Sequence, residues 1–284
     1  MQPFDYYLPK DFDDAFKYLS TPGKTVVPLA GATDFIPTFR DGHWKADAVV
    51  DIKSLPGMRT IKETPQGLYI GAAVKMSELI DSPIVQSGWE LLAQAAKTVG
   101  SPQIRNRATI GGNLCTASPC ADTPPALLAL DALVILKSVS GERQVPIVEF
   151  FTWVRKTVVA QGELVLAVIL PKLPSGSAGA YVKLSRRRGS DLSLVSVAAV
   201  AIPGNTGYQW KLALGAVAPT PIRVPAAEAI LLQGHTLDLI EKSALAASET
   251  SRPISDVRSS ERYRKVMVAN MTKRAIQETL AKLG

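Results

Sequence analysis

The stretch that decides the fold reads RATIGGNLCTASPCAD and covers residues 107–122 of the 284-residue chain. Two adjacent glycines, Gly111 and Gly112, stand between an apolar lead-in and a run of small polar residues, so the backbone there can turn sharply and approach another group closely. Main-chain N–H groups freed by such a turn, beside the side chains of Thr109 and Asn113, suit a phosphate. The stretch therefore predicts a loop that contacts a phosphorylated ligand, although its composition is also typical of an ordinary loop.

The carboxylate of Asp122, at the end of this stretch, has two interpretations. It is placed to accept a hydrogen bond from the ribose of a nucleotide. It also stands directly before Thr123, Pro124 and Pro125, and proline in the first turn is typical of a helix start that an aspartate caps. The residues alone leave both interpretations open.

A second stretch, nearer the N-terminus, has the same character. Residues 25–30 (TVVPLA) predict a buried strand, residues 31–34 (GATD) form a turn of small residues, and a short helical pattern begins at Phe35. A strand, a tight turn and a helix start leave N–H groups pointing at an anion. A diphosphate held between the two stretches is the simplest common explanation.

Together the two stretches resemble the FAD-binding medium subunit of the molybdenum hydroxylases. That family includes xanthine dehydrogenase, aerobic carbon monoxide dehydrogenase and several bacterial N-heterocycle and aldehyde dehydrogenases. The similarity extends over nearly the whole chain. The segments that carry it are residues 29–34, 108–113, 117–132, 4–9 (FDYYLP), 181–187 (YVKLSRR) and the helical tail after Arg252.

The resemblance implies an α+β fold in two domains. The first, residues 1–174, is expected to be a vanillyl-alcohol-oxidase-like (PCMH-type) FAD-binding domain of two subdomains, with their boundary near residues 55–65. The second, residues 175–284, is expected to be a smaller α+β domain with a three-stranded antiparallel sheet and helices. The segment PKLPSGSAG, residues 171–179, is rich in Pro, Gly and Ser and independently predicts a linker at this point.

The resemblance also implies which residues bind FAD. Residues 29–36 would form one diphosphate loop and residues 109–113 the other, while Lys183 would lie near the isoalloxazine. Ala32 departs from the family, in which a second glycine is common. No catalytic side chain and no metal ligand is expected. The full set of expected FAD contacts is Leu29, Ala30, Gly31, Ala32, Thr33, Asp34, Phe35, Ile36, Thr109, Ile110, Gly111, Gly112, Asn113, Thr116, Asp122, Val165 and Lys183.

The function implied by the resemblance is electron transfer within a larger enzyme. A large partner subunit with a molybdenum cofactor would oxidise the substrate, and a small partner with two [2Fe-2S] clusters would pass the electrons to FAD in this chain. The final acceptor would be NAD or another molecule, and the assembly a dimer of heterotrimers. Two alternatives remain open: a stand-alone FAD-dependent oxidoreductase of the same fold, and a nucleotide-binding scaffold without redox activity.

Composition and charge narrow the class of protein. Hydrophobic residues make up 46% of the chain and charged residues 20%, and no apolar run approaches the roughly 20 residues of a membrane span. The N-terminus has no signal-peptide pattern, so a cytoplasmic location is expected. The net charge of +7 comes from scattered basic residues without a recognition motif, which argues against nucleic-acid binding.

The sequence has few metal-binding side chains and lacks the common nucleotide-binding motifs. Both facts narrow the class of protein further. Only two cysteines, Cys115 and Cys120, and two histidines are present, too few for an iron–sulfur cluster or a structural zinc site in this chain alone. The glycine patterns of Rossmann folds, P-loops and nucleophile elbows are also missing. Because the sequence shows no clear catalytic acid, base or nucleophile, it favours a protein in which a bound cofactor carries out the chemistry.

Periodicity predicts the secondary structure around these motifs. Residues 1–60 predict a βαβ-type unit, and a hairpin is expected across residues 140–141. A short helix is predicted over residues 149–153. Beyond the linker, strands are predicted at 180–184, 194–202 and 208–217, and helices at 226–232, 237–249 and 259–283.

Overall fold

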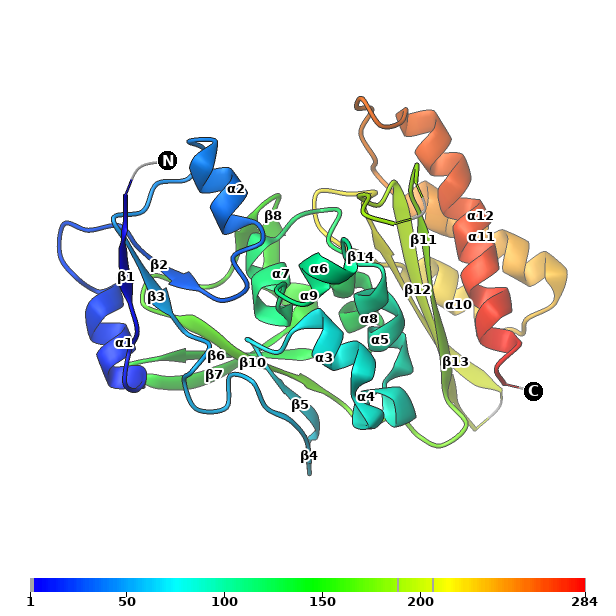
Figure 1. The fold of residues 1–284 in the computed structure, drawn as a ribbon. Coiled ribbons are helices and arrows are strands. Elements are labelled where there is room, and N and C mark those ends of the chain that lie inside the picture. Colours follow the sequence, from blue (N-terminus) through cyan, green and yellow to red (C-terminus); the bar gives the residue numbers. More distant parts are fainter. Residues whose placement is uncertain (1–2, 188, 206, 284) are drawn as a thin grey trace.

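The computed structural model describes residues 3–187, 189–205 and 207–283. Its described residues form three main sheets, of three, five and four strands, and one two-stranded ribbon. The sheets follow one another along the chain and across the molecule, as the colours in Figure 1 show. Most of the helices lie between the second and third sheets or on the outer face of the third (Figure 1).

The N-terminal sheet is parallel, with strand order β1-β3-β2. The helix α1 begins after Asp11, whose carboxylate accepts a hydrogen bond from the N–H of Asp14, and α2 fills the crossover between β2 and β3. This confirms the predicted βαβ unit and adds β1 to it. The elements are β1 (Asp5–Tyr7), α1 (Phe12–Leu19), β2 (Val26–Leu29), α2 (Phe35–Arg40) and β3 (Ala48–Asp51).

The second sheet is antiparallel, with strand order β4-β5-β10-β6-β7. Its central strand β10 is buried along its whole length, which explains the unbroken apolar sequence LVLAVIL. The predicted hairpin is confirmed in the pairing of β6 with β7. The strands are β4 (Ile61–Thr64), β5 (Gly67–Gly71), β6 (Leu133–Ser138), β7 (Gly141–Pro146) and β10 (Leu164–Leu170).

Short helices connect the strands of this sheet and cover one side of it. They are α3 (Met76–Asp81), α4 (Pro83–Gly88), α5 (Glu90–Lys97), α6 (Pro102–Arg105), α7 (Ile110–Thr116), α8 (Thr123–Ala129) and α9 (Ile147–Phe150). The predicted helix over residues 149–153 is wrong beyond Phe150. Residues Phe151–Trp153 instead form β8, which pairs with β9 (Lys156–Thr157), because the chain reverses at Arg155 with a φ of 56°.

The C-terminal sheet is antiparallel, in the order β11-β12-β13-β14. The three predicted strands are present, and Ile222–Arg223 adds a fourth strand too short to leave a periodic pattern in the sequence. The elements are β11 (Ala178–Leu184), β12 (Val195–Pro203), β13 (Tyr208–Gly215), β14 (Ile222–Arg223), α10 (Pro225–Leu231), α11 (Leu237–Thr250) and α12 (Glu261–Leu280).

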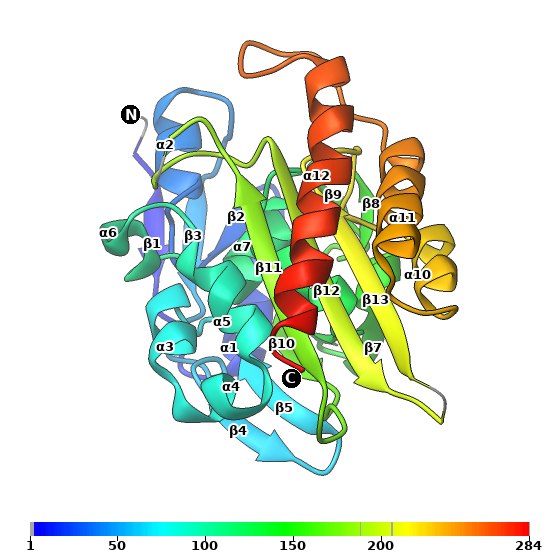
Figure 2. The same ribbon diagram turned by 90° about the vertical axis from the view of Figure 1, so that its right-hand side faces the viewer.

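Both faces of this last sheet are buried. On β12, Ala198 and Val200 face the core of the preceding domain, where α5 and α8 lie, whereas Val197 and Ala199 face α10, α11 and α12. The outer layer of helices is seen over the sheet in Figure 2. Alternate residues of β12 thus pack in two different hydrophobic cores, so the strand is apolar at every position and not only at every second one. These contacts also hold the C-terminal sheet against the rest of the chain.

No helix among the described residues is both long and apolar enough to span a bilayer.

Candidate functional site

The two glycine motifs lie together around one cavity of about 850 Å³, which is within the size range of small-molecule sites. Gly31 packs so closely on the second stretch that a Cβ there would overlap the carbonyl oxygen of Arg107. The hydroxyl of Thr116 donates a hydrogen bond to Asp34 across the gap, at 3.4 Å. Two stretches about 80 residues apart in the sequence thus form adjacent walls of the same cavity.

The first motif supplies an array of unpaired main-chain donors. It runs from Gly31 to Phe35, between the end of β2 and the start of α2, and all five residues line the cavity. Within the described part of the chain, none of their five N–H groups has a hydrogen-bond acceptor, whereas the next one, on Ile36, donates to the carbonyl of Ala32 at 3.1 Å. Unpaired N–H groups beside a cavity are costly without a ligand and attract an anion.

Ala32 has a φ of 63°, in the left-handed region that favours glycine. Replacing it with glycine relieves about 1–2 kcal/mol of strain in the folded chain. The opposing effect is smaller, because the more flexible glycine stabilises the unfolded chain by about 0.4–1 kcal/mol through its entropy. We expect Ala32→Gly to raise the free energy of unfolding by roughly 0.5–1 kcal/mol, measured with urea. Ala30→Gly, at a residue without positive φ, is the control and should lower it; a destabilised Ala32→Gly chain would contradict the argument.

The second motif differs from its predicted form, because it is the first turn of α7 and not an open loop. Thr109 caps the helix, its hydroxyl accepting from the N–H of Gly112 at 3.1 Å. The N–H groups of Ile110 and Gly111 donate to the carbonyls of Val74 and Ala72 at 3.0 and 2.8 Å, and that of Asn113 donates to the carbonyl of Thr109 at 2.9 Å, so the N–H groups of residues 110–113 are all engaged. The expectation that residues 110–113 offer N–H groups to a phosphate is therefore wrong. These residues contribute small side chains to the cavity wall.

The two glycines of that motif, Gly111 and Gly112, have different structural roles. A Cβ on Gly111 would lie 2.5 Å from the Cβ and 2.8 Å from the carbonyl oxygen of Ala72, so this glycine is required for packing α7 on the end of β5. A Cβ on Gly112 would meet only the hydroxyl of Thr109, at 2.9 Å. Of the pair, Gly112 is the one whose missing side chain leaves space in the cavity.

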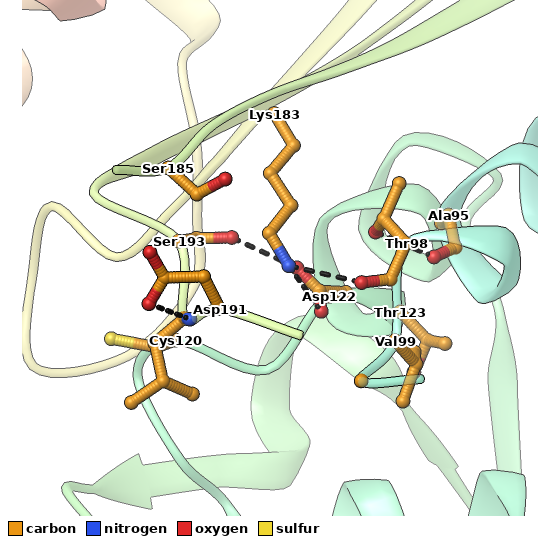
Figure 3. Close-up of polar contacts among 12 residues, drawn as sticks. Ala95, Thr98, Val99, Cys120, Asp122, Thr123, Lys183, Ser185, Asp191 and Ser193 are labelled. Carbon is orange, nitrogen blue, oxygen red and sulfur yellow. Dashed lines mark hydrogen bonds and ion pairs between the residues drawn. The ribbon is translucent and has the colours of Figure 1, made fainter. Parts of the chain in front are cut away.

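Asp122 is held in a buried network that joins the two domains (Figure 3). One carboxylate oxygen forms an ion pair with Lys183 at 3.0 Å, and the other accepts from the hydroxyls of Ser193 at 2.8 Å and Tyr181 at 3.3 Å. The ammonium of Lys183 also donates to the carbonyl of Thr98 at 3.0 Å. Burial raises the pKa of the Asp122 carboxyl, and the ion pair with Lys183 is the largest effect opposing that rise.

This network revises both interpretations of Asp122. Its side chain does not cap α8, although proline does stand in the first turn of that helix. It lines the cavity, but its hydrogen-bonding capacity is largely taken up by β11 and the segment before β12. Lys183 lies behind it and does not line the cavity, so Lys183 is neutralised by a carboxylate and is not a bare cation.

Most residues expected at the site do line the cavity. Ile36 does not, because it lies on the exposed side of α2, and Ile110 does not, because it is fully buried in the core. Lys183 is the third exception. Those that line it are Leu29, Ala30, Gly31, Ala32, Thr33, Asp34, Phe35, Thr109, Gly111, Gly112, Asn113, Thr116, Asp122 and Val165.

Sequence reasoning missed the walls that carry no motif. Residues 24–27, Thr157, residues 159–164 and residues 190–192 line the cavity, the last being a loop of the C-terminal domain. In that loop Asp191 accepts from the N–H of Arg187 at 3.1 Å, which holds the loop in shape, and Leu192 is half exposed. Only tertiary packing brings these segments to the site, and no local pattern in the sequence marks them.

Family models match almost the whole chain. The model described as "FAD binding domain in molybdopterin dehydrogenase" matches residues 2–173, and that of the "CO dehydrogenase flavoprotein C-terminal domain" matches residues 180–279. The chain belongs to the FAD-binding medium subunits of the molybdenum hydroxylases. This confirms the family inferred from the two glycine motifs. The chain is accordingly an oxidoreductase subunit with an FAD-binding domain.

Other proteins match this chain along nearly their whole length. The carbon monoxide dehydrogenase medium chain of Hydrogenophaga pseudoflava is 32% identical over 98% of both chains. The glyceraldehyde dehydrogenase medium chain of Sulfolobus acidocaldarius is 35% identical over 97% of this chain and 98% of its own. A solved carbon monoxide dehydrogenase from Hydrogenophaga pseudoflava contains a chain that superposes with a TM-score of 0.94 at 33% identity, covering 99% of both chains, which confirms the expected fold.

Proposed function

We propose that this medium subunit binds one FAD in the cavity and relays electrons between partner subunits and an acceptor. The observation that carries the proposal is the run of five unpaired N–H groups in residues 31–35, facing a wall kept small by Gly112. A diphosphate is the part of FAD that such donors suit. Bound FAD would supply the ability to accept electrons one at a time and release them in pairs.

The chain's own residues would hold and enclose the cofactor. Residues 29–35 would bind the diphosphate, Gly112, Asn113 and Thr116 would form the adjacent wall, and Val165 on β10 would pack against the ligand. Asp122 would contribute mainly by keeping the cavity closed against the C-terminal domain, through Lys183. We likewise propose residues 1–174 and 175–284 as the two domains that this contact joins.

The partners belong to the same proposal. The relatives are named as medium chains or FAD subunits of carbon monoxide, nicotinate and xanthine dehydrogenases. By analogy, a [2Fe-2S] subunit would deliver electrons and a molybdenum-cofactor subunit would oxidise the substrate, in a dimer of heterotrimers, with NAD or another molecule as final acceptor. Asp122, a buried carboxylate at the cavity wall, is engaged in an ion pair, so it is not poised to act as an acid or base on a substrate.

The test is the absorption spectrum of the purified chain, followed by acid release and identification of the chromophore. We expect a yellow protein that releases about one FAD per chain, or a colourless one that recovers this spectrum when FAD is added. Saturating FAD that leaves both the spectrum and the melting temperature unchanged would overturn the proposal. Reduction of the loaded chain, with NAD then supplied as oxidant, would show whether NAD is the acceptor.

A further inference from the structure

One wall of the cavity is a short turn outside both glycine motifs. Residues 158–163 connect β9 to β10, and residues 159–163 of this connection line the cavity. The N–H of Glu163 donates to the carbonyl of Ala160 at 3.1 Å, and the carboxylate of Glu163 accepts from the N–H of Ala160 at 2.8 Å, so the turn closes on itself. Gly162 has a φ of 82°, in the left-handed region that favours glycine. We call residues 158–163 the wall turn.

Arg143, on the edge strand β7, holds the wall turn at both of its ends. Its Nε and Nη2 donate to the two carboxylate oxygens of Glu163, at 2.7 and 2.8 Å, and Nη2 also donates to the carbonyl of Val158 at 3.0 Å. A guanidinium can make this contact because its donors form a rigid planar fork. The hydrogen bond from Arg143 is also the main cause of the lowered pKa of the Glu163 carboxyl, so the pair stays charged near neutral pH.

The Arg143–Glu163 pair contributes little to the stability of the whole chain. The side chain of Arg143 is 47% exposed, and ion pairs that involve exposed side chains add little to the free energy of unfolding. Arg143 does not line the cavity, whereas Glu163 does. The pair therefore acts mainly on the shape of the wall turn.

The tip of the wall turn carries two main-chain donors. Within the described residues, the N–H groups of Gln161 and Gly162 have no hydrogen-bond acceptor, and both residues line the cavity. Such donors bind a ligand best when their positions are set before it arrives, because ordering a turn during binding costs conformational entropy.

The wall turn lies toward one end of the cavity. Leu164, directly after it, pairs with Lys137, whose ammonium lies 5.1 Å from the ring centroid of Phe12 in α1. The turn is thus next to the N-terminal unit, whereas residues 190–192 bring the C-terminal domain to the cavity. The N-terminal and C-terminal sheets lie at opposite ends of the molecule (Figure 1). Because FAD has one head on each side of its diphosphate, the wall turn can contact only one of the two heads.

We propose that Arg143 is a positioning residue for FAD, because its contacts with Glu163 and Val158 hold the wall turn in the shape that receives one head of the cofactor. The inference rests on the proposed function, since it takes FAD to be the ligand of the cavity. Arg143 acts through the wall turn and not by touching the ligand. Its removal should leave the fold intact but loosen the turn, and FAD must then order the turn as it binds.

The experiment compares two arginine variants of the full-length chain. Arg143→Met removes the fork. Arg274→Met is the control, because Arg274 donates to Glu278 at 2.7 Å on the exposed surface of α12 and does not line the cavity. We expect Arg143→Met to weaken FAD binding by about tenfold, mainly through faster dissociation, and Arg274→Met to leave it unchanged. Without FAD, both variants should unfold in urea close to the wild-type midpoint.

Two fragments of the cofactor separate a positioning role from general damage to the cavity. ADP and FMN each carry one head of FAD, so Arg143→Met should weaken the binding of one fragment and leave that of the other unchanged. Equal losses for both fragments, or a clearly lower urea midpoint, would mean that the whole cavity is disturbed and would overturn the inference.

Arg143→Lys tests whether the fork matters or only its charge. A lysine ammonium cannot reproduce the fork, so FAD binding should stay close to that of Arg143→Met. Adding Arg143→Met to Glu163→Gln should weaken binding no further, because both changes break the same contact. Full FAD affinity in Arg143→Met, full rescue by Arg143→Lys, or additive losses in the double variant would contradict the positioning role, while FAD binding by the wild-type chain upholds the proposed function. A wild-type chain that does not bind FAD would refute the proposed function, and this inference with it.

Discussion

Gly112→Val is expected to abolish FAD retention while leaving the chain folded. Gly112 lies in the first turn of α7, where a Cβ would meet the hydroxyl of Thr109 at 2.9 Å. A side chain there would displace this hydroxyl and cost about 1 kcal/mol of helix capping, which the fold should tolerate. Gly112 lines the cavity, and a branched side chain would fill space that the cofactor needs. We expect FAD affinity to fall by at least about tenfold, or roughly 1.4 kcal/mol, measured by fluorescence titration.

Gly88→Val is the matched control. Gly88 is the exposed last residue of α4, a Cβ there meets nothing within 4 Å, and it does not line the cavity. The Gly88→Val chain should therefore retain full FAD affinity. Gly111→Val would be a misleading test, because its side chain would collide with Ala72 and disturb packing. Full flavin content in Gly112→Val, with circular dichroism unchanged, would refute the assignment of this wall to FAD.

Lys183→Met is expected to have the largest effect on stability. It removes the cation paired with Asp122 and leaves a carboxylate that is 7% exposed without its charge partner. Breaking a buried ion pair from one side costs about 3–5 kcal/mol, so the midpoint of urea unfolding should fall sharply. The C-terminal sheet is held to the first domain partly through this pair. We therefore also expect Lys183→Met to lose FAD at a lower urea concentration than the wild-type chain.

The pH dependence provides an independent check of this explanation. Burial already raises the pKa of the Asp122 carboxyl, and loss of Lys183 should raise it further. A carboxyl whose pKa is higher in the folded than in the unfolded chain binds more protons when folded, so its cost is present above the folded pKa and is relieved as the pH falls through it. The destabilisation of Lys183→Met relative to wild type should therefore shrink on acidification.

Two further variants separate this buried pair from ordinary surface charge. In the double variant Asp122→Asn, Lys183→Met no buried charge remains, and much of the lost stability should return. Lys242→Met removes an ion pair with Asp238 that is largely exposed, 61% and 70% for the two side chains, and should cost at most about 0.5 kcal/mol. Equal effects of Lys183→Met and Lys242→Met would contradict a structural role for the buried pair.

Local sequence was sufficient to predict most helices and strands and one half of the site, the turn at residues 31–35. The strand, turn and helix around residues 25–40 follow from an apolar run, a stretch of small residues and a helical pattern, all of which act over a few residues. The free N–H groups of residues 31–35 were predicted for that reason. The same reasoning failed at residues 110–113, because whether an N–H is free depends on what packs against it. There Val74 and Ala72 supply the acceptors.

What the sequence by itself determined is the family, the order of the elements and the position of both glycine motifs, because these depend on neighbouring residues and on the spacing of motifs. Tertiary structure alone decided that Gly31 packs on Arg107, that Lys183 pairs with Asp122 and that residues 190–192 complete the cavity. Each of these contacts joins segments that are far apart in the chain. Their pairing is set by how two sheets and their helices bury apolar surface together, and no local pattern records that choice.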